Sequence, residues 1–127
     1  MSDLMANLRV LVVDDERAIA DSLTAICRLR GLDAVAVYSG EAVVKEAISR
    51  PPAFLIADIS MNGMNGIEAA IEVARACPGC RILLFSGHPE SGGLLEKARN
   101  GGHAFEVLTK PVHPTRIFEW LDGKHSG

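Results

Sequence analysis

The segment LRVLVVDD, residues 8–15, runs from a nearly continuous apolar stretch into two adjacent acidic residues. Consecutive Val and Leu side chains indicate a strand that is covered on both faces, as the strands of a parallel sheet are. Asp14 and Asp15 follow at the carboxyl end of this strand, which is where open parallel sheets place their ligand sites. The segment therefore predicts both an interior strand and a candidate site next to it.

The rest of the chain alternates between short apolar runs and segments with helical periodicity. Further strands are expected at residues 34–38, 53–57, 82–85 and 104–108. Helices are expected at residues 16–30, 39–50, 67–77, 94–98 and 114–121, with Ser39 as an N-cap and Pro114 at the first helical position. Five strands alternating with five helices predict an α/β fold, a doubly wound five-stranded parallel sheet of the flavodoxin-like (βα)5 type.

Four of the five predicted strands end in a polar side chain that can do chemistry. The strand at 34–38 is the exception, and its alternating pattern is typical of a sheet edge, so the predicted strand order is 2-1-3-4-5. The carboxyl ends of parallel strands meet at one edge of the sheet. That edge is expected to carry Asp14 and Asp15 from the first strand, Asp58 from the third, Ser86 from the fourth and Lys110 from the fifth.

Three carboxylates that lie close together require a compensating cation, because like charges raise one another's pKa. Oxygen ligands without His or Cys select a hard ion, and a few carboxylates completed by water suit Mg²⁺ better than Ca²⁺. Such a site can receive a phosphoryl group. Lys110 would bind one phosphoryl oxygen while a carboxylate attacks phosphorus in line, and the product would be an acyl phosphate on an aspartate.

With these residues in place, the chain resembles the receiver domain of bacterial two-component response regulators over nearly its whole length. The resemblance rests on four blocks in the expected order: Val13, Asp14 and Asp15; Asp58 with Met61, Met64 and Gly66; Ser86; and Thr109, Lys110 and Pro111.

The resemblance implies a role for each site residue. Asp58 is the phosphoacceptor, and Ser86 and Lys110 bind the phosphoryl oxygens. The metal ligands are Asp15 and Asp58 directly, the backbone carbonyl of Ser60, and Asp14 through a water molecule. The resemblance also implies a cis peptide bond between Lys110 and Pro111.

By the same resemblance the chain is a phosphorylation-controlled switch and not an enzyme, apart from self-phosphorylation by small donors and self-dephosphorylation. A histidine kinase or phosphotransfer protein would supply the phosphoryl group. The face formed by the helix at 94–98, the strand at 104–108 and the helix at 114–121 would then change and regulate a downstream protein or an output domain.

Two alternatives remain open at this stage. One is a docking module that keeps the fold but works without phosphorylation. The other is an aspartyl-phosphate phosphatase, which usually carries a second acid two residues after its nucleophile, where this chain has Ser60.

The chain departs from the family pattern at two positions. Asn62 stands where receivers usually have proline, which predicts a more flexible loop after Asp58. Val107 stands where they usually have an aromatic residue that moves inward on activation, and Phe105 lies two positions earlier. The form of the switch is therefore expected to differ from the family pattern at Val107.

Length and composition limit the remaining possibilities. The 127 residues fit a single receiver domain, residues 1–127, without an output domain. With 13 basic and 16 acidic residues the net charge is −3, and the scattered basic residues predict no direct contact with nucleic acid. No apolar run approaches the length of a membrane span, and residues 1–7 lack the features of a secretory signal, so we expect a cytoplasmic protein.

The three cysteines are expected to remain thiols. Cys77 and Cys80 form a CxxC motif, but it follows a helix, whereas redox pairs lie at a helix amino terminus. A zinc site would need a second pair of ligands, which the sequence does not offer.

Overall fold

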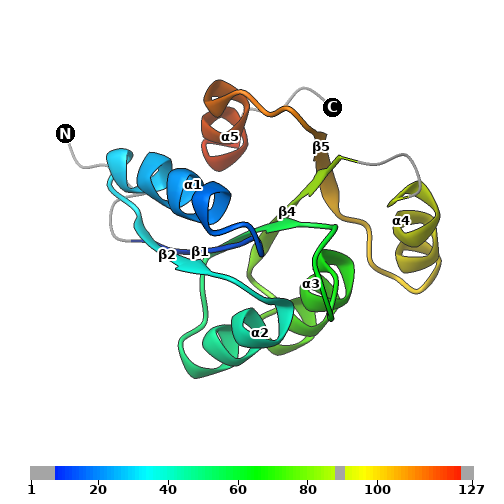
Figure 1. Cartoon of the computed structure of the whole chain (residues 1–127). Helices are drawn as coiled ribbons and strands as arrows, with labels where there is room; N and C mark the ends of the chain where they lie inside the picture. The colour runs from blue at the N-terminus through cyan, green and yellow to red at the C-terminus, as the bar shows by residue number, and fades with distance from the viewer. Residues whose placement is uncertain (1–7, 88–90, 124–127) are drawn as a thin grey trace.

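In the computed structural model, which describes residues 8–87 and 91–123, five parallel strands form one sheet in the order β2-β1-β3-β4-β5 (Figure 1). The predicted fold class and strand order are confirmed. The strands are β1 (Arg9–Val13), β2 (Asp33–Val37), β3 (Phe54–Asp58), β4 (Arg81–Ser86) and β5 (Glu106–Thr109). The helices are α1 (Arg17–Leu29), α2 (Gly40–Ser49), α3 (Gly66–Ala76), α4 (Ser91–Asn100) and α5 (Pro114–Leu121).

Helices cover both faces of the sheet, with α1 and α5 on one side and α2 and α3 on the other (Figure 1). The side chains of β1 alternate between two cores, which explains why nearly every residue of this strand is apolar. Leu11 and Val13 belong to the core under α2 and α3. Val10 and Val12 belong to the core under α1 and α5, where Trp120 is the largest buried side chain.

Capping residues that can be recognised in the sequence mark the first turn of three helices. The Ser39 side chain accepts a hydrogen bond from the Ala42 N–H at 3.1 Å, so the predicted N-cap of α2 is confirmed. Asn65 and Glu68 form a reciprocal capping box at the start of α3. At α5, Pro114 is the first helical residue as predicted, and the Nδ1 atom of His113 accepts from the Thr115 N–H at 3.1 Å.

Several elements differ in their bounds or buried face from the sequence-based expectation; the largest difference in bounds is at α4, which spans Ser91–Asn100 where residues 94–98 were expected. The buried residues of α1 are Ala20, Thr24 and Cys27. The larger Leu23 is half-buried and packs against the same core. Strand β5 begins at Glu106 and not at residue 104, because its pairing with β4 starts at Leu83 and Glu106.

The remaining expectations concern termini, membranes and thiols. Residues 1–7 and His88 lie outside the described residues. Among the helices that the structure describes, none is long and apolar enough to cross a bilayer. Cys27, Cys77 and Cys80 are free thiols.

Gly66 marks the tightest contact between a helix and the sheet. A Cβ atom at this position would lie 2.1 Å from the backbone oxygen of Asp58, closer than any real Cβ contact. At Gly93, in the first turn of α4, a Cβ atom would meet nothing within 4 Å.

We therefore predict opposite effects of alanine at these two helical glycines. Gly66→Ala should lower the free energy of unfolding by about 3 kcal/mol, because backbone atoms must move to accept the methyl group. Gly93→Ala should raise it by about 0.5 kcal/mol through helix propensity. Urea denaturation of both variants measures the two changes, and equal stabilities would contradict the prediction.

Candidate functional site

The register of the sheet brings the predicted site residues to one edge. Val13 pairs with Ala57, so Asp14 and Asp58 leave adjacent strands side by side. Asp58 pairs with Phe85, so Ser86 follows one residue later at the end of β4. Ser86 pairs with Thr109, the last residue of β5, and Lys110 comes next in the chain. The Lys110 N–H donates to the backbone oxygen of Ser86 at 2.9 Å, which extends the ladder into the site. The peptide bond between Lys110 and Pro111 is cis, as the resemblance implied.

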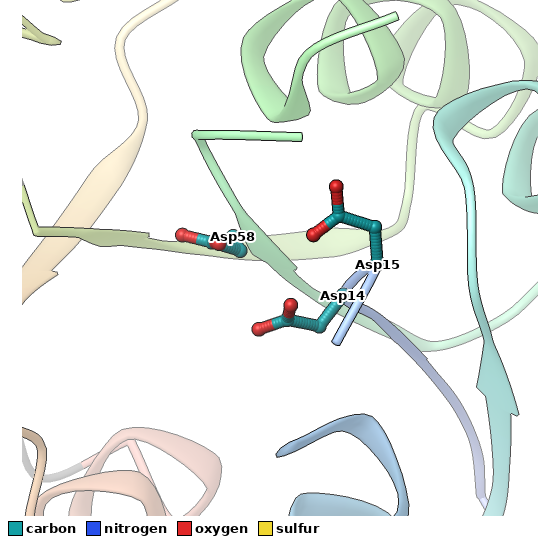
Figure 2. A group of neighbouring side chains, drawn as sticks. All are labelled: Asp14, Asp15 and Asp58. Carbon is teal, nitrogen blue, oxygen red and sulfur yellow. The ribbon is translucent and has the colours of Figure 1, made fainter. Parts of the chain in front are cut away.

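Three carboxylates meet at this edge of the sheet. Asp14, Asp15 and Asp58 each offer an oxygen atom, and these atoms lie within 4.8 Å of one another. Figure 2 shows the three side chains gathered around one space, with Asp14 and Asp15 coming from the end of β1 and Asp58 from β3. Asp14 is 1% exposed and Asp58 is 7% exposed, whereas Asp15 is half-buried.

Lys110 is the cation that faces this cluster. Its Nζ atom lies 3.3 Å from Oδ1 of Asp58 and 3.9 Å from Oδ2 of Asp14. One ammonium group therefore stands against three carboxylates, and the local charge remains negative. The expectation that Lys110 and the acids converge is met by these distances.

Asp14 experiences the strongest electrostatic conflict. Its Oδ1 atom accepts a hydrogen bond from the Glu16 N–H at 2.9 Å, but its buried Oδ2 atom has no hydrogen-bond partner among the described residues. Burial raises the pKa of the Asp14 carboxyl, and the charges of Asp58 and Asp15 raise it further. The Glu16 N–H and Lys110 act in the opposite direction without cancelling the effect.

These features fit a hard divalent cation. The carboxylates supply oxygen atoms only, and Oδ2 of Asp14, which lacks a hydrogen-bond partner among the described residues, is a buried acceptor that a cation or its bound water can satisfy. The residues that could bind such an ion are Asp14, Asp15 and Asp58. Ser60 is exposed in the loop that follows β3, two residues after Asp58.

Ser86 stands at the end of β4, as the strand pattern predicts. It is half-buried, and it lies on the same edge of the sheet as Asp58 and Lys110. From this position the Ser86 hydroxyl could contact a group that is bound at Asp58.

The sequence reasoning missed the residues that orient the loop between β3 and α3. The Asn62 N–H donates to Oδ2 of Asp15 at 2.9 Å, and the Met64 N–H donates to Oε2 of Glu41 at 3.2 Å. The Asn-x-x-Glu capping pattern at residues 65–68 was a usable sequence signal for the end of this loop. Nothing in the sequence indicates the contact of Glu41, because it joins residues 23 positions apart.

The chain belongs to the response regulator receiver domain family, whose model matches residues 10–122. It is 29% identical over 115 residues to the chemotaxis protein CheY of Thermotoga maritima, covering 90% of this chain and 94% of that protein. It is 28% identical over 109 residues to the DNA-binding response regulator MtrA of Mycobacterium leprae, covering 86% of this chain and 47% of that protein. The chain thus spans about half the length of the mycobacterial relatives that it matches.

Solved structures agree on the fold. A response regulator receiver domain protein from Clostridium thermocellum superposes with a TM-score of 0.81 at 21% identity, over 92% of this chain and 93% of that chain. The Vibrio cholerae chemotaxis protein CheY4 superposes with a TM-score of 0.80 at 22% identity, over 94% of this chain and 100% of that chain.

Family membership confirms the resemblance seen in the four sequence blocks. It supports a phosphorylation-controlled role in two-component signalling.

The crowding of negative charge predicts that Asp14 lowers stability in the absence of metal. Asp14→Asn keeps the Oδ1 acceptor for the Glu16 N–H and removes the charge that burial, Asp58 and Asp15 oppose, at the cost of the 3.9 Å ion pair between Oδ2 and Lys110. At pH 7 without divalent ions it should raise the free energy of unfolding by about 1 kcal/mol. Chemical denaturation measures this change. As a control, Asp33→Asn removes an exposed carboxylate 3.8 Å from Arg50 and should have almost no effect. A loss of stability in Asp14→Asn would contradict the prediction.

Proposed function

We propose that this chain is a signalling switch that accepts a phosphoryl group on Asp58 from a histidine kinase or a phosphotransfer protein. The observation that carries the proposal is the position of Asp58. It ends β3 inside the carboxylate cluster, is 7% exposed, and has the Lys110 ammonium 3.3 Å from its Oδ1 atom. A carboxylate at a strand end with one cation beside it is suited to in-line attack on phosphorus.

The transfer forms a bond between an Asp58 carboxylate oxygen and phosphorus, and it breaks the bond between phosphorus and the imidazole nitrogen of the donor histidine. The electron pair of the broken bond remains on that nitrogen, which then takes up a proton. Lys110 and Ser86 bind phosphoryl oxygens and orient the group, which lowers the entropic barrier to transfer. Asp58 is half of the ion pair with Lys110 before transfer, so the pair must rearrange as the phosphoryl group arrives.

Asp15, Asp58 and the backbone carbonyl of Ser60 would hold Mg²⁺, with Asp14 reaching it through water. When bound, Mg²⁺ supplies positive charge that offsets the charge of the phosphoryl oxygens. The excess of carboxylates over cations in the cluster, and the Oδ2 atom of Asp14 that lacks a hydrogen-bond partner among the described residues, support this assignment.

Phosphorylation adds a charge of roughly −1.5 to −2 at the end of β3. Ser86 and Lys110 stand at the ends of β4 and β5, so their movement toward the phosphoryl group carries the loops after these strands with them. The face of α4, β5 and α5 then changes. Val107 and Phe105 are both half-buried, and Val107 has no ring that could move inward, so the proposed change does not include the aromatic step of other receivers.

The target of this face is a separate protein or an output domain joined to the receiver. The relatives include both a chemotaxis protein of about the same length and a DNA-binding regulator of about twice the length. We propose no direct contact of this domain with nucleic acid, because its basic residues are scattered and its net charge is −3.

The two alternatives make different demands on the site. A phosphatase would need a second acid near Asp58 at the position of Ser60, and this residue is an exposed serine. A phosphorylation-independent docking module would not need the carboxylate cluster at all. Labelling with a small phosphodonor separates the switch from the docking module.

Incubation with a small acyl phosphate and Mg²⁺ should add one phosphoryl group to the chain. Intact mass spectrometry measures the gain, which should be absent in Asp58→Asn and in the presence of a metal chelator. Asp33→Asn serves as a matched control and should be labelled like the wild type. An unchanged mass under conditions that label another receiver would favour the docking module, and steady turnover of a phosphate ester would favour the phosphatase.

Mg²⁺ should also stabilise the folded chain. At a concentration of about 100 times the dissociation constant, a single site adds roughly 2.7 kcal/mol to the free energy of unfolding. Thermal unfolding with MgCl₂, compared with NaCl of equal ionic strength, measures the effect. Asp15→Asn should remove most of it, and an equal shift in both salts would argue against a specific site.

A further inference from the structure

A groove between α3 and α4, two helices that contact each other, lies outside the site described above (Figure 1). Its volume is about 350 Å³, and none of the described residues assigned to metal or phosphoryl binding lines it. Sites for small molecules have volumes of roughly 300 to 1,000 Å³. This space, named here the α3–α4 groove, is therefore large enough for a small organic molecule.

Apolar side chains from both helices line the α3–α4 groove. Ile67 and Ile71 stand one turn apart on α3, and Leu94 and Ala98 stand one turn apart on α4. Ile67 and Ala98 are buried and Ile71 is half-buried, whereas Leu94 is 43% exposed. An apolar molecule that covers Leu94 would remove this exposed surface from water, which favours binding.

Two cations also line the groove, one from each helix. Lys97, on α4, is exposed and has no ion-pair partner among the described residues. Arg75, on α3, lies 3.4 Å from Glu72, but the two side chains are 67% and 49% exposed. Such an exposed ion pair is weak, so the guanidinium of Arg75 remains available to another anion.

The acid that lines the groove, Glu68, is already engaged at the start of α3. Its Oε1 atom accepts a hydrogen bond from the Asn65 N–H at 2.9 Å as part of the capping box. Lys97 and Arg75 thus stand against a single carboxylate that has another partner. The groove is therefore locally positive in a chain whose net charge is −3, and it is complementary to an anion.

We propose that the α3–α4 groove binds a small carboxylate with an apolar body. The apolar body lies against Leu94 and Ile71, and the carboxylate lies beside Lys97 and Arg75. The groove takes no part in phosphoryl transfer, so this inference goes beyond the proposed function.

A matched pair of probes tests both parts of the proposal. 4-Phenylbutyrate joins an aromatic body to a carboxylate, and 4-phenylbutyramide has the same shape without the charge. Each probe is titrated into the ¹⁵N-labelled chain at pH 7 without divalent ions, and amide chemical shifts locate the binding site. We expect shifts in α3 and α4, with a dissociation constant on the order of 1 mM for a carboxylate of this size. The amide should bind about fivefold more weakly.

Two variants of α4 separate the local cation from the net charge. Lys97→Gln should weaken the binding of 4-phenylbutyrate about threefold and leave the binding of 4-phenylbutyramide unchanged. Arg99→Gln makes the same change of charge on the same helix, but Arg99 is exposed and does not line the groove. Both probes should therefore bind to Arg99→Gln as they bind to the wild type.

A second pair of variants tests the apolar contact. Leu94→Ala should weaken the binding of both probes by the same factor, about threefold, because it removes apolar surface from the groove. Leu29→Ala makes the same substitution at an 84% exposed position on α1, so it should change neither affinity. The amide spectra of all four variants also show whether the fold is intact.

Several outcomes would overturn the proposal. These are the absence of a saturable shift with 4-phenylbutyrate, equal affinities of the two probes, and equal effects of Lys97→Gln and Arg99→Gln. Shifts confined to the surroundings of Lys110 would place the carboxylate elsewhere, with the same consequence. Shifts in α3 and α4 that depend on protein concentration without a probe would show that a second copy of the chain covers the groove. The titration uses the unphosphorylated chain without Mg²⁺, so its outcome is independent of whether Asp58 accepts a phosphoryl group.

Discussion

The concentration of negative charge at the carboxyl edge of the sheet is the constraint on which the rest of the site depends. Three carboxylates lie within 4.8 Å of one another, and Lys110 supplies the cation that faces them. Asp14 is 1% exposed, and its second oxygen has no hydrogen-bond partner in the described part of the chain. The fold tolerates this arrangement because the interior strands and their two apolar cores provide stability elsewhere.

The same arrangement makes the site sensitive to added charge. Asp58 is paired with Lys110 across 3.3 Å, and a phosphoryl group on Asp58 would change both the charge and the size of that partner. Lys110 is joined to β4 through the bond from its N–H to the Ser86 carbonyl, so the two strand ends cannot respond independently. The charge at the end of β3 thus lies in one contact chain with β4 and with β5, the edge strand that α4 and α5 flank (Figure 1).

Much of the fold and the site could be predicted from sequence. The apolar run before Asp14 indicated an interior strand, and the four polar strand ends indicated a shared edge, because parallel strands all point the same way. Ser39 and Pro114 marked the starts of α2 and α5 through local hydrogen bonding and backbone restriction. The inner face of α1 was less predictable, since Thr24 is buried there although its hydroxyl has no partner among the described residues.

The sequence by itself determined the order of strands and helices, the set of acids and the lysine at the strand ends, and the resemblance to receivers. These follow from periodicity and from chemistry that is local in the chain. Only the tertiary structure decided that Asn62 donates to Asp15 and that Met64 donates to Glu41. Such bonds join backbone groups to side chains 47 and 23 positions away, and a backbone N–H is the same in every residue except proline. Their partners depend on how the loop packs against α2, which no residue type specifies alone.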